Sequence, residues 1–176
     1  MRFILAQIFG IIALVLVCIG YFTKTKPTFL IIQTIANFFY ASAFYVVEAY
    51  VGAFIVVISI FRCMYLYFAE KHSFKYKIHL LPIFVVLYTI ITIIFWQNPY
   101  DFMPLITTIM FTFGFTIKNM KKMLYFLIIP NVILVVYNIL TTTYASALLD
   151  LIEAIVIVVA IIKLNKNKET KFSINR

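Results

Sequence analysis

The chain has 176 residues, of which 65% are hydrophobic and 12% charged, with a net charge of +9 and a mean hydropathy of +1.07. A soluble domain is about half apolar and about a quarter charged, so this composition excludes one and indicates an integral membrane protein. We attribute the basic excess to membrane topology and attraction to anionic lipid, and expect no nucleic-acid partner.

Charges and turn-forming residues divide the apolar sequence into segments close to the roughly 20 residues that a membrane-spanning helix needs. In chain order, seven helices are predicted at residues 3–22, 28–47, 50–69, 78–96, 102–117, 123–142 and 144–164. The fifth is short, and only the polar stretch "TTTYAS" separates the last two, so a six-span alternative stays open. Helices are expected throughout, because open strands would leave backbone amides unpaired in lipid.

The basic residues indicate the orientation of these segments. With seven spans, thirteen of the fifteen fall on one side, in the first, third and fifth connections and in the tail. Basic loops stay in the cytoplasm, so we expect a multi-pass membrane protein with its N-terminus outside and its C-terminus cytoplasmic. Merging the last two segments would move the basic tail to the other side.

The first segment also resembles a signal peptide, with Cys18 at a position typical of lipoprotein cleavage. Val15 and Val17 stand where a peptidase needs small side chains, so we expect the segment to be retained.

A shift of 94 positions aligns the two halves of the chain. It pairs Gly20 with Gly114, Lys24 with Lys118, Asn37 with Asn131, Tyr50 with Tyr144, and Ala53 with Ala147. Two units with an odd number of helices face the same way only if one further span separates them. We therefore predict two parallel three-helix repeats, residues 1–69 and 98–164, joined by a linker helix with its loop at 70–97 and followed by a basic cytoplasmic tail at 165–176.

This arrangement of three plus one plus three helices resembles the SWEET and PQ-loop group of membrane proteins. Through "QTIANFFYASAFYVVEAYVGAFIVVISIFR" and "MPLITTIMFTFGFTIKNMKKMLYFLIIPNVILVVYNI", the chain looks like the YgjV-type bacterial inner membrane proteins. The resemblance implies a fold and at most a class of function. No Pro-Gln dipeptide occurs, and the asparagines lie on the second helix of each unit rather than the third, so the sugar transport of SWEET proteins is not carried over.

Polar stripes on the second and sixth segments supply the candidate substrate-binding residues. Helical spacing places the members of each stripe close to one face, and lipid-facing amides would lack partners, so both stripes should face inward. They either bind a polar solute or bond across helices and only stabilise the bundle, by about 0.6 kcal/mol each. The residues are Gln33, Asn37, Tyr40, Asn131, Tyr137 and Asn138.

Three ionisable residues lie within predicted spans, Arg62 on the third and Asp150 with Glu153 on the seventh. The 94-residue shift places Glu153 about 4.5 Å in depth from Arg62, so the two can meet between the halves. One interpretation is a gate or proton-coupling site, in which a carboxylate changes protonation. In the other, Arg62 and Asp150 extend to opposite membrane surfaces, hydrated and without function.

Pro104 and Pro130 are predicted to interrupt helices of the second unit, and Pro130 removes one backbone hydrogen bond. The sequence shows no Gly-rich phosphate loop, nucleophile beside a base or metal-ligand spacing, so no enzyme activity, cofactor or metal is expected.

Two functions fit this sequence. The first is a facilitator or exchanger that passes a small polar solute by alternating access. The second is an accessory or structural membrane protein with a dry, packed interior. The expected partners are the lipid bilayer, the unidentified solute and, as an open option, a second copy of the chain.

Overall fold

The computed structural model describes residues 2–48, 50–71, 81–96, 99–141 and 143–174, which form seven α-helices and one short 3₁₀ helix. The elements are α1 (Arg2–Tyr21), α2 (Lys26–Val46), α3 (Tyr50–Lys71), α4 (Leu81–Ile94), η1 (Pro99–Asp101), α5 (Phe102–Gly114), α6 (Met120–Leu140) and α7 (Tyr144–Ile174).

The all-α prediction and its seven segments are confirmed. Because α6 ends at Leu140 and α7 begins at Tyr144, the last two segments are separate helices, and merging them was wrong. The fifth helix ends at Gly114, three residues before its predicted end. The predicted start of the fourth segment at residue 78 lies outside the described residues, as do Lys75, Lys77 and Arg176.

Helix length sets which segments can cross a bilayer. In the described residues, four helices are long and apolar enough, namely α1, α2, α3 from Gly52 onward and α6. Helices α4 and α5 have 14 and 13 residues. At about 1.5 Å per residue, the described parts of these two helices reach across only part of a hydrocarbon layer about 30 Å thick.

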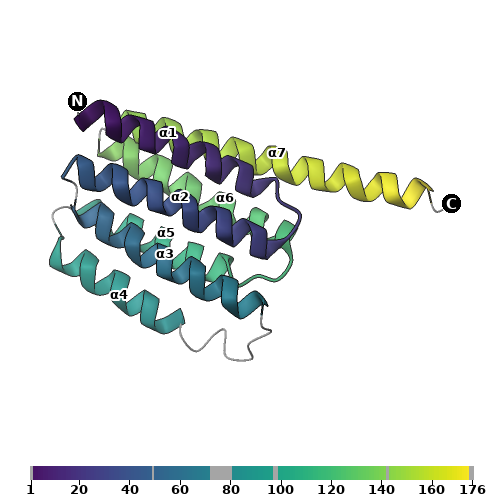
Figure 1. The fold of residues 1–176 in the computed structure, drawn as a ribbon, viewed down its shortest axis with the longest axis horizontal. Helices are drawn as coiled ribbons and strands as arrows, with labels where there is room; N and C mark the ends of the chain where they lie inside the picture. The colour runs from purple at the N-terminus through teal and green to yellow at the C-terminus, as the bar shows by residue number, and fades with distance from the viewer. Residues whose placement is uncertain (1, 49, 72–80, 97–98, 142, 175–176) are drawn as a thin grey trace.

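The helices form two layers (Figure 1). One layer contains α1, α2 and α3 side by side, and the other contains α5, α6 and α7, with α4 at the edge beside α3 and α5. Each helix packs against the next in the chain, and α7 packs against α1 and closes the ring. The inner faces of the two layers meet along a seam, and α7 continues beyond the bundle to Ile174.

Aromatic and aliphatic side chains fill the seam near the end from which α7 projects. The ring of Phe29 on α2 meets that of Phe115, just after α5, edge-on at a centroid distance of 5.4 Å, so the contact joins the two layers. Met123, Leu124 and Leu127 of α6 pack into the same core and are fully buried. This end of the seam is apolar, and close packing holds the layers together there.

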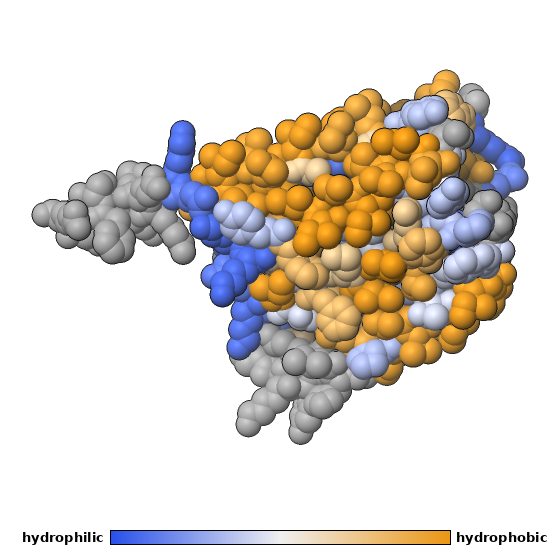
Figure 2. Space-filling model, turned by 180° about the vertical axis from the view of Figure 1, so that it is seen from behind, coloured by the Kyte–Doolittle hydropathy of each residue, from blue (hydrophilic) through white to orange (hydrophobic). Residues whose placement is uncertain are grey.

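The outer surface explains the composition. Apolar side chains cover most of the face seen in Figure 2, and hydrophilic ones gather at the end from which α7 projects, with a smaller group at the opposite end. At that end Lys163 of α7 lies over the ring of Phe22, 5.3 Å from its centroid. A surface of this kind has an apolar band that suits lipid and a basic end that suits water and headgroups.

A buried ion pair also lies at the basic end. Lys26, the first residue of α2, donates to Glu70 near the end of α3 at 2.6 Å, and the two side chains are only 6% and 16% exposed. Lys26 is one of the basic residues that the sequence places in the first connection, and in the structure it also joins α2 to α3.

Gly114 allows close packing of α5 against α6. A Cβ atom at this position would lie 2.9 Å from side-chain atoms of both Leu127 and Phe126. We expect Gly114→Ala to lower the free energy of unfolding by about 1–3 kcal/mol, because the added methyl overpacks the interface. The measurement is unfolding of the purified protein in detergent micelles. Gly10→Ala is the control, since its Cβ meets nothing within 4 Å, and equal losses in the two variants would contradict the interpretation.

The ion pair gives a second prediction. Lys26→Met deprives the carboxylate of Glu70 of this buried cation, so it should cost about 3–5 kcal/mol of stability. The double variant Lys26→Met/Glu70→Met should recover most of that loss, because it buries no uncompensated charge. The same unfolding measurement on the single and double variants tests this, and equal stability of wild type and Lys26→Met would show that the pair is unimportant.

Candidate functional site

A carboxylate on α7 joins three helices at the seam. Glu153 accepts hydrogen bonds from the hydroxyls of Tyr21 on α1 and Tyr40 on α2, each at 3.3 Å and each at a different carboxylate oxygen. Tyr21 is 3% exposed, and Tyr40 and Glu153 are partly buried. The two hydroxyls replace part of the hydration that the carboxylate loses inside the bundle.

Asp150, one turn earlier on α7, has a different partner. The side-chain amide of Asn138 on α6 donates to it at 2.6 Å, and the amide oxygen of Asn138 accepts from the Thr143 hydroxyl at 2.8 Å. Both ends of this amide are therefore used in the hairpin between α6 and α7. Asn138 fixes that turn, and the partly buried Tyr137 precedes it on the same helix.

The guanidinium of Arg62 on α3 lies in a second polar cluster, formed with α4 and α5. Its Nη1 donates to the Thr112 hydroxyl at 2.9 Å and to the Thr108 carbonyl at 3.3 Å. Its central carbon lies 5.1 Å from the ring centroid of Phe115 and 5.8 Å from that of Tyr88, distances at which a cation is attracted to an aromatic face. Arg62 is 4% exposed, and its Nε has no acceptor in the described part of the chain.

Arg62 and Glu153, which the sequence suggested as partners, do not form an ion pair in the described residues. The ion pairs found there join Arg2 to Glu48 and Lys26 to Glu70. Arg62 is also too buried to extend to a membrane surface. Both ionisable side chains thus lie inside the bundle, each held by neutral polar groups.

The central amides are buried, but they do not bond to each other in the structure. Asn37 is 7% exposed and donates to the sulfur of Cys63 at 3.8 Å, whereas Asn131 is 1% exposed and donates to the carbonyl of Leu127 in its own helix at 2.8 Å. Gln33 is partly buried, and its Oε1 is buried without a donor in the described ranges. The amides face inward as predicted, with bonds that stay within one layer.

Helix α2 links the two polar clusters. Asn37 contacts Cys63, the neighbour of Arg62 in the sequence, and Tyr40, one helical turn further on, contacts Glu153. Asn37 and Tyr40 are three residues apart, so their side chains lie on nearly the same face of α2. The polar stripe predicted on this segment therefore contacts both α3 and α7.

The two prolines lie in different settings. Pro104 is in the first turn of α5, where its missing N–H is tolerated, so it does not interrupt that helix. Pro130 is inside α6 and cannot donate to the carbonyl of Phe126, yet the helix continues to Leu140.

A bundle with an apolar exterior and ionisable groups in its interior is typical of an integral membrane protein. Residues 4–168 match the family model Imp-YgjV, described as bacterial inner membrane protein. The chain belongs to this family. No curated protein and no solved structure matches the chain. The family match confirms the YgjV-type resemblance and fits the bacterial inner membrane expected from the sequence.

The site of this YgjV-type protein includes hydroxyl residues that the sequence did not single out. Tyrosine and threonine are common in membrane helices, so they carry little signal, whereas an arginine or a carboxylate in such a helix is conspicuous. The sequence singled out the ionisable residues, but it did not predict which side chains would bond to them. The missed residues are Tyr21, Tyr88, Thr108 and Thr112, together with Ser59, whose hydroxyl lies 2.8 Å from that of Tyr88.

The chemistry available to these clusters follows from their groups. Glu153, held by two hydroxyls, can accept or release a proton, and Arg62, with an unused donor, can bind an anionic or carbonyl oxygen. Within the described ranges, no three His, Cys, Asp or Glu side chains gather in a way that could hold a metal ion.

The Glu153 cluster yields a prediction on stability. Glu153→Leu leaves the hydroxyls of Tyr21 and Tyr40 without their acceptor, so it should cost about 1–3 kcal/mol for each hydroxyl left unsatisfied. Glu153→Gln keeps an acceptor of similar shape and should lose much less. Thermal unfolding of both variants in detergent tests this, and equal midpoints would show that the hydroxyls do not depend on Glu153.

Proposed function

We propose that this protein is a facilitator or exchanger of a small polar solute, which it passes across the membrane by alternating access. In this proposal the three-helix units α1–α3 and α5–α7 rock against each other, with α4 as the linker, as in the SWEET and PQ-loop group. The N-terminus lies outside and the basic end in the cytoplasm, since basic loops stay on the cytoplasmic side.

The observation that carries the proposal is that both ionisable clusters cross the seam between the layers. Arg62 belongs to α3 and bonds to α5, whereas Glu153 belongs to α7 and bonds to α1 and α2. Each bond has a length of 2.9–3.3 Å and joins one charged group to a neutral hydroxyl or carbonyl, a partner that water or a polar solute can replace when the layers separate. Contacts of this kind suit a seam that opens.

The 94-residue repeat relates the two contacts. It pairs Tyr21, which donates to Glu153, with Phe115, whose ring faces Arg62. In each unit, an ionisable residue of the third helix therefore meets an aromatic residue at the end of the other unit's first helix. Repeats of this kind place substrate sites at their interface in membrane transporters.

The alternative function, an accessory or structural membrane protein, is favoured by a different observation. Asn131 is 1% exposed and bonded within its own helix, and the contact between Phe29 and Phe115 closes one end of the seam. A bundle that never opens would show the same packing. The two functions differ in whether water reaches the centre.

Cysteine accessibility distinguishes these functions. In a background with Cys18→Ala and Cys63→Ala, we place single cysteines by Asn37→Cys or Asn131→Cys and reconstitute the protein in lipid vesicles. A charged, membrane-impermeant thiol reagent should label both positions, because an alternating-access centre is wet in part of its cycle.

The matched control is Ile129→Cys, two residues from Asn131 on the same helix and 52% exposed on the outer surface, where lipid excludes the reagent. Lys118 is exposed beyond the end of α5, so the labelling of Lys118→Cys gives the reference level for a fully accessible cysteine. If Asn37→Cys and Asn131→Cys react no faster than Ile129→Cys, the carrier proposal is wrong and the structural function is preferred.

A further inference from the structure

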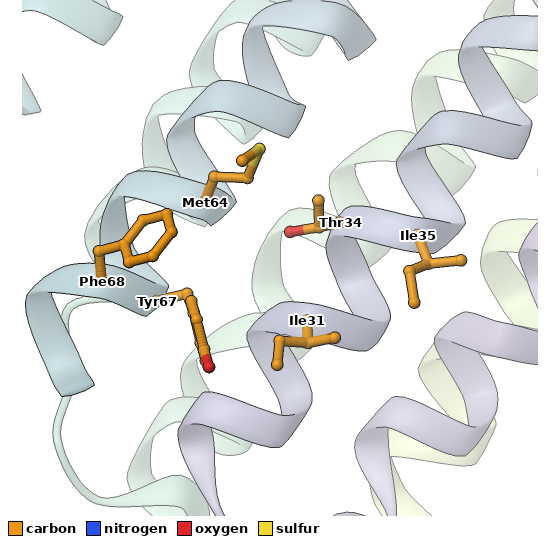
Figure 3. Close-up of a pocket in the computed structure, with 6 residues that line it drawn as sticks. All are labelled: Ile31, Thr34, Ile35, Met64, Tyr67 and Phe68. Carbon is orange, nitrogen blue, oxygen red and sulfur yellow. The ribbon is translucent and has the colours of Figure 1, made fainter.

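An outward-facing groove lies between α2 and α3, near the basic end (Figure 3). Its volume is about 210 Å³, and the side chains that line it, drawn as sticks in Figure 3, come from both α2 and α3. The groove is separate from the seam, since four of its residues are 40–50% exposed on the outside of the bundle. The lining residues are Ile31, Thr34, Ile35, Met64, Tyr67 and Phe68.

The lining favours an apolar occupant. The Thr34 hydroxyl already donates to the carbonyl of Leu30 at 2.8 Å, so this bond does not require a ligand. The other five lining residues are aliphatic, aromatic or sulfur-containing. A cavity lined in this way binds water poorly and accepts apolar groups. In an inner membrane protein, the apolar groups that surround such a face are lipid acyl chains.

A cation lies where the headgroup of such a lipid would be. Lys71 is one helical turn beyond Tyr67 and exposed, and its Nζ is 5.9 Å from the centroid of the Tyr67 ring that lines the groove. The adjacent carboxylate of Glu70 is held by Lys26 at 2.6 Å, so its charge is largely neutralised and opposes a phosphate less. The groove thus has an apolar wall and a positive charge at one end.

We propose that this groove, with Lys71, is a binding site for an anionic phospholipid from the leaflet at the basic end of the bundle. An acyl chain lies between α2 and α3, and the headgroup phosphate bonds to the ammonium of Lys71. The site does not depend on solute transport, because none of its residues lies in the polar clusters of the seam.

The test titrates the purified full-length protein with phosphatidylglycerol and with phosphatidylcholine of the same acyl chains, and native mass spectrometry measures bound lipid. Wild type should bind phosphatidylglycerol more tightly. Lys71→Gln should reduce that preference by about fivefold, since one basic residue near the surface contributes about 1 kcal/mol to binding anionic lipid. Met64→Trp, which fills the groove, should weaken the binding of both lipids.

Lys121→Gln is the matched control, because Lys121 also lies over a tyrosine ring, at 5.7 Å, but does not line the groove. It should keep the wild-type preference. The proposal is overturned if wild type shows no preference, if Lys71→Gln retains it, or if Met64→Trp binds both lipids as wild type does. A wild-type dimer that Met64→Trp converts to monomer, with lipid binding unchanged, would show that a second copy occupies the groove.

Discussion

The free-energy cost of ionisable side chains inside an apolar bundle is the constraint on which this structure depends. An unpaired charge at that depth costs several kcal/mol, so Arg62 and Glu153 need polar partners. The chain supplies hydroxyls, a carbonyl and aromatic faces instead of opposite charges. Because each set of partners belongs to the other layer, the polar contacts also hold the two layers in register.

Apolar packing and polar contacts lie side by side in the seam. Near the basic end, edge-on aromatic rings, the close approach of α5 and α6 at Gly114 and the buried pair of Lys26 with Glu70 make a closely packed region. The two polar clusters adjoin this region, because the ring of Tyr21, which donates to Glu153, lies 5.8 Å from that of Phe29, and the ring of Phe115 faces Arg62. Apolar packing and polar contacts therefore meet in one core and together hold the two layers against each other.

The sequence predicts the helices well, because charges and turn-forming residues mark most of the ends of the apolar segments, whereas the uncharged "TTTYAS" left the last boundary open. It also identifies Arg62 and Glu153 as buried ionisable residues and Asn37 and Asn131 as inward-facing amides. Their partners depend on which helices are neighbours. The 94-residue repeat predicts only that Arg62 and Glu153 lie at similar depths along their helices. Which helices are neighbours decides the contacts, so Arg62 bonds to α5 and Glu153 bonds to α1 and α2.

The central claim is that Arg62 and Glu153 are held in separate clusters. A double-mutant cycle on the free energy of unfolding, with Arg62→Gln, Glu153→Gln and the double variant, tests it most directly. Separate clusters predict that the two single effects add within about 0.5 kcal/mol. A coupling of several kcal/mol would mean that the two charges pair directly, and would contradict the account.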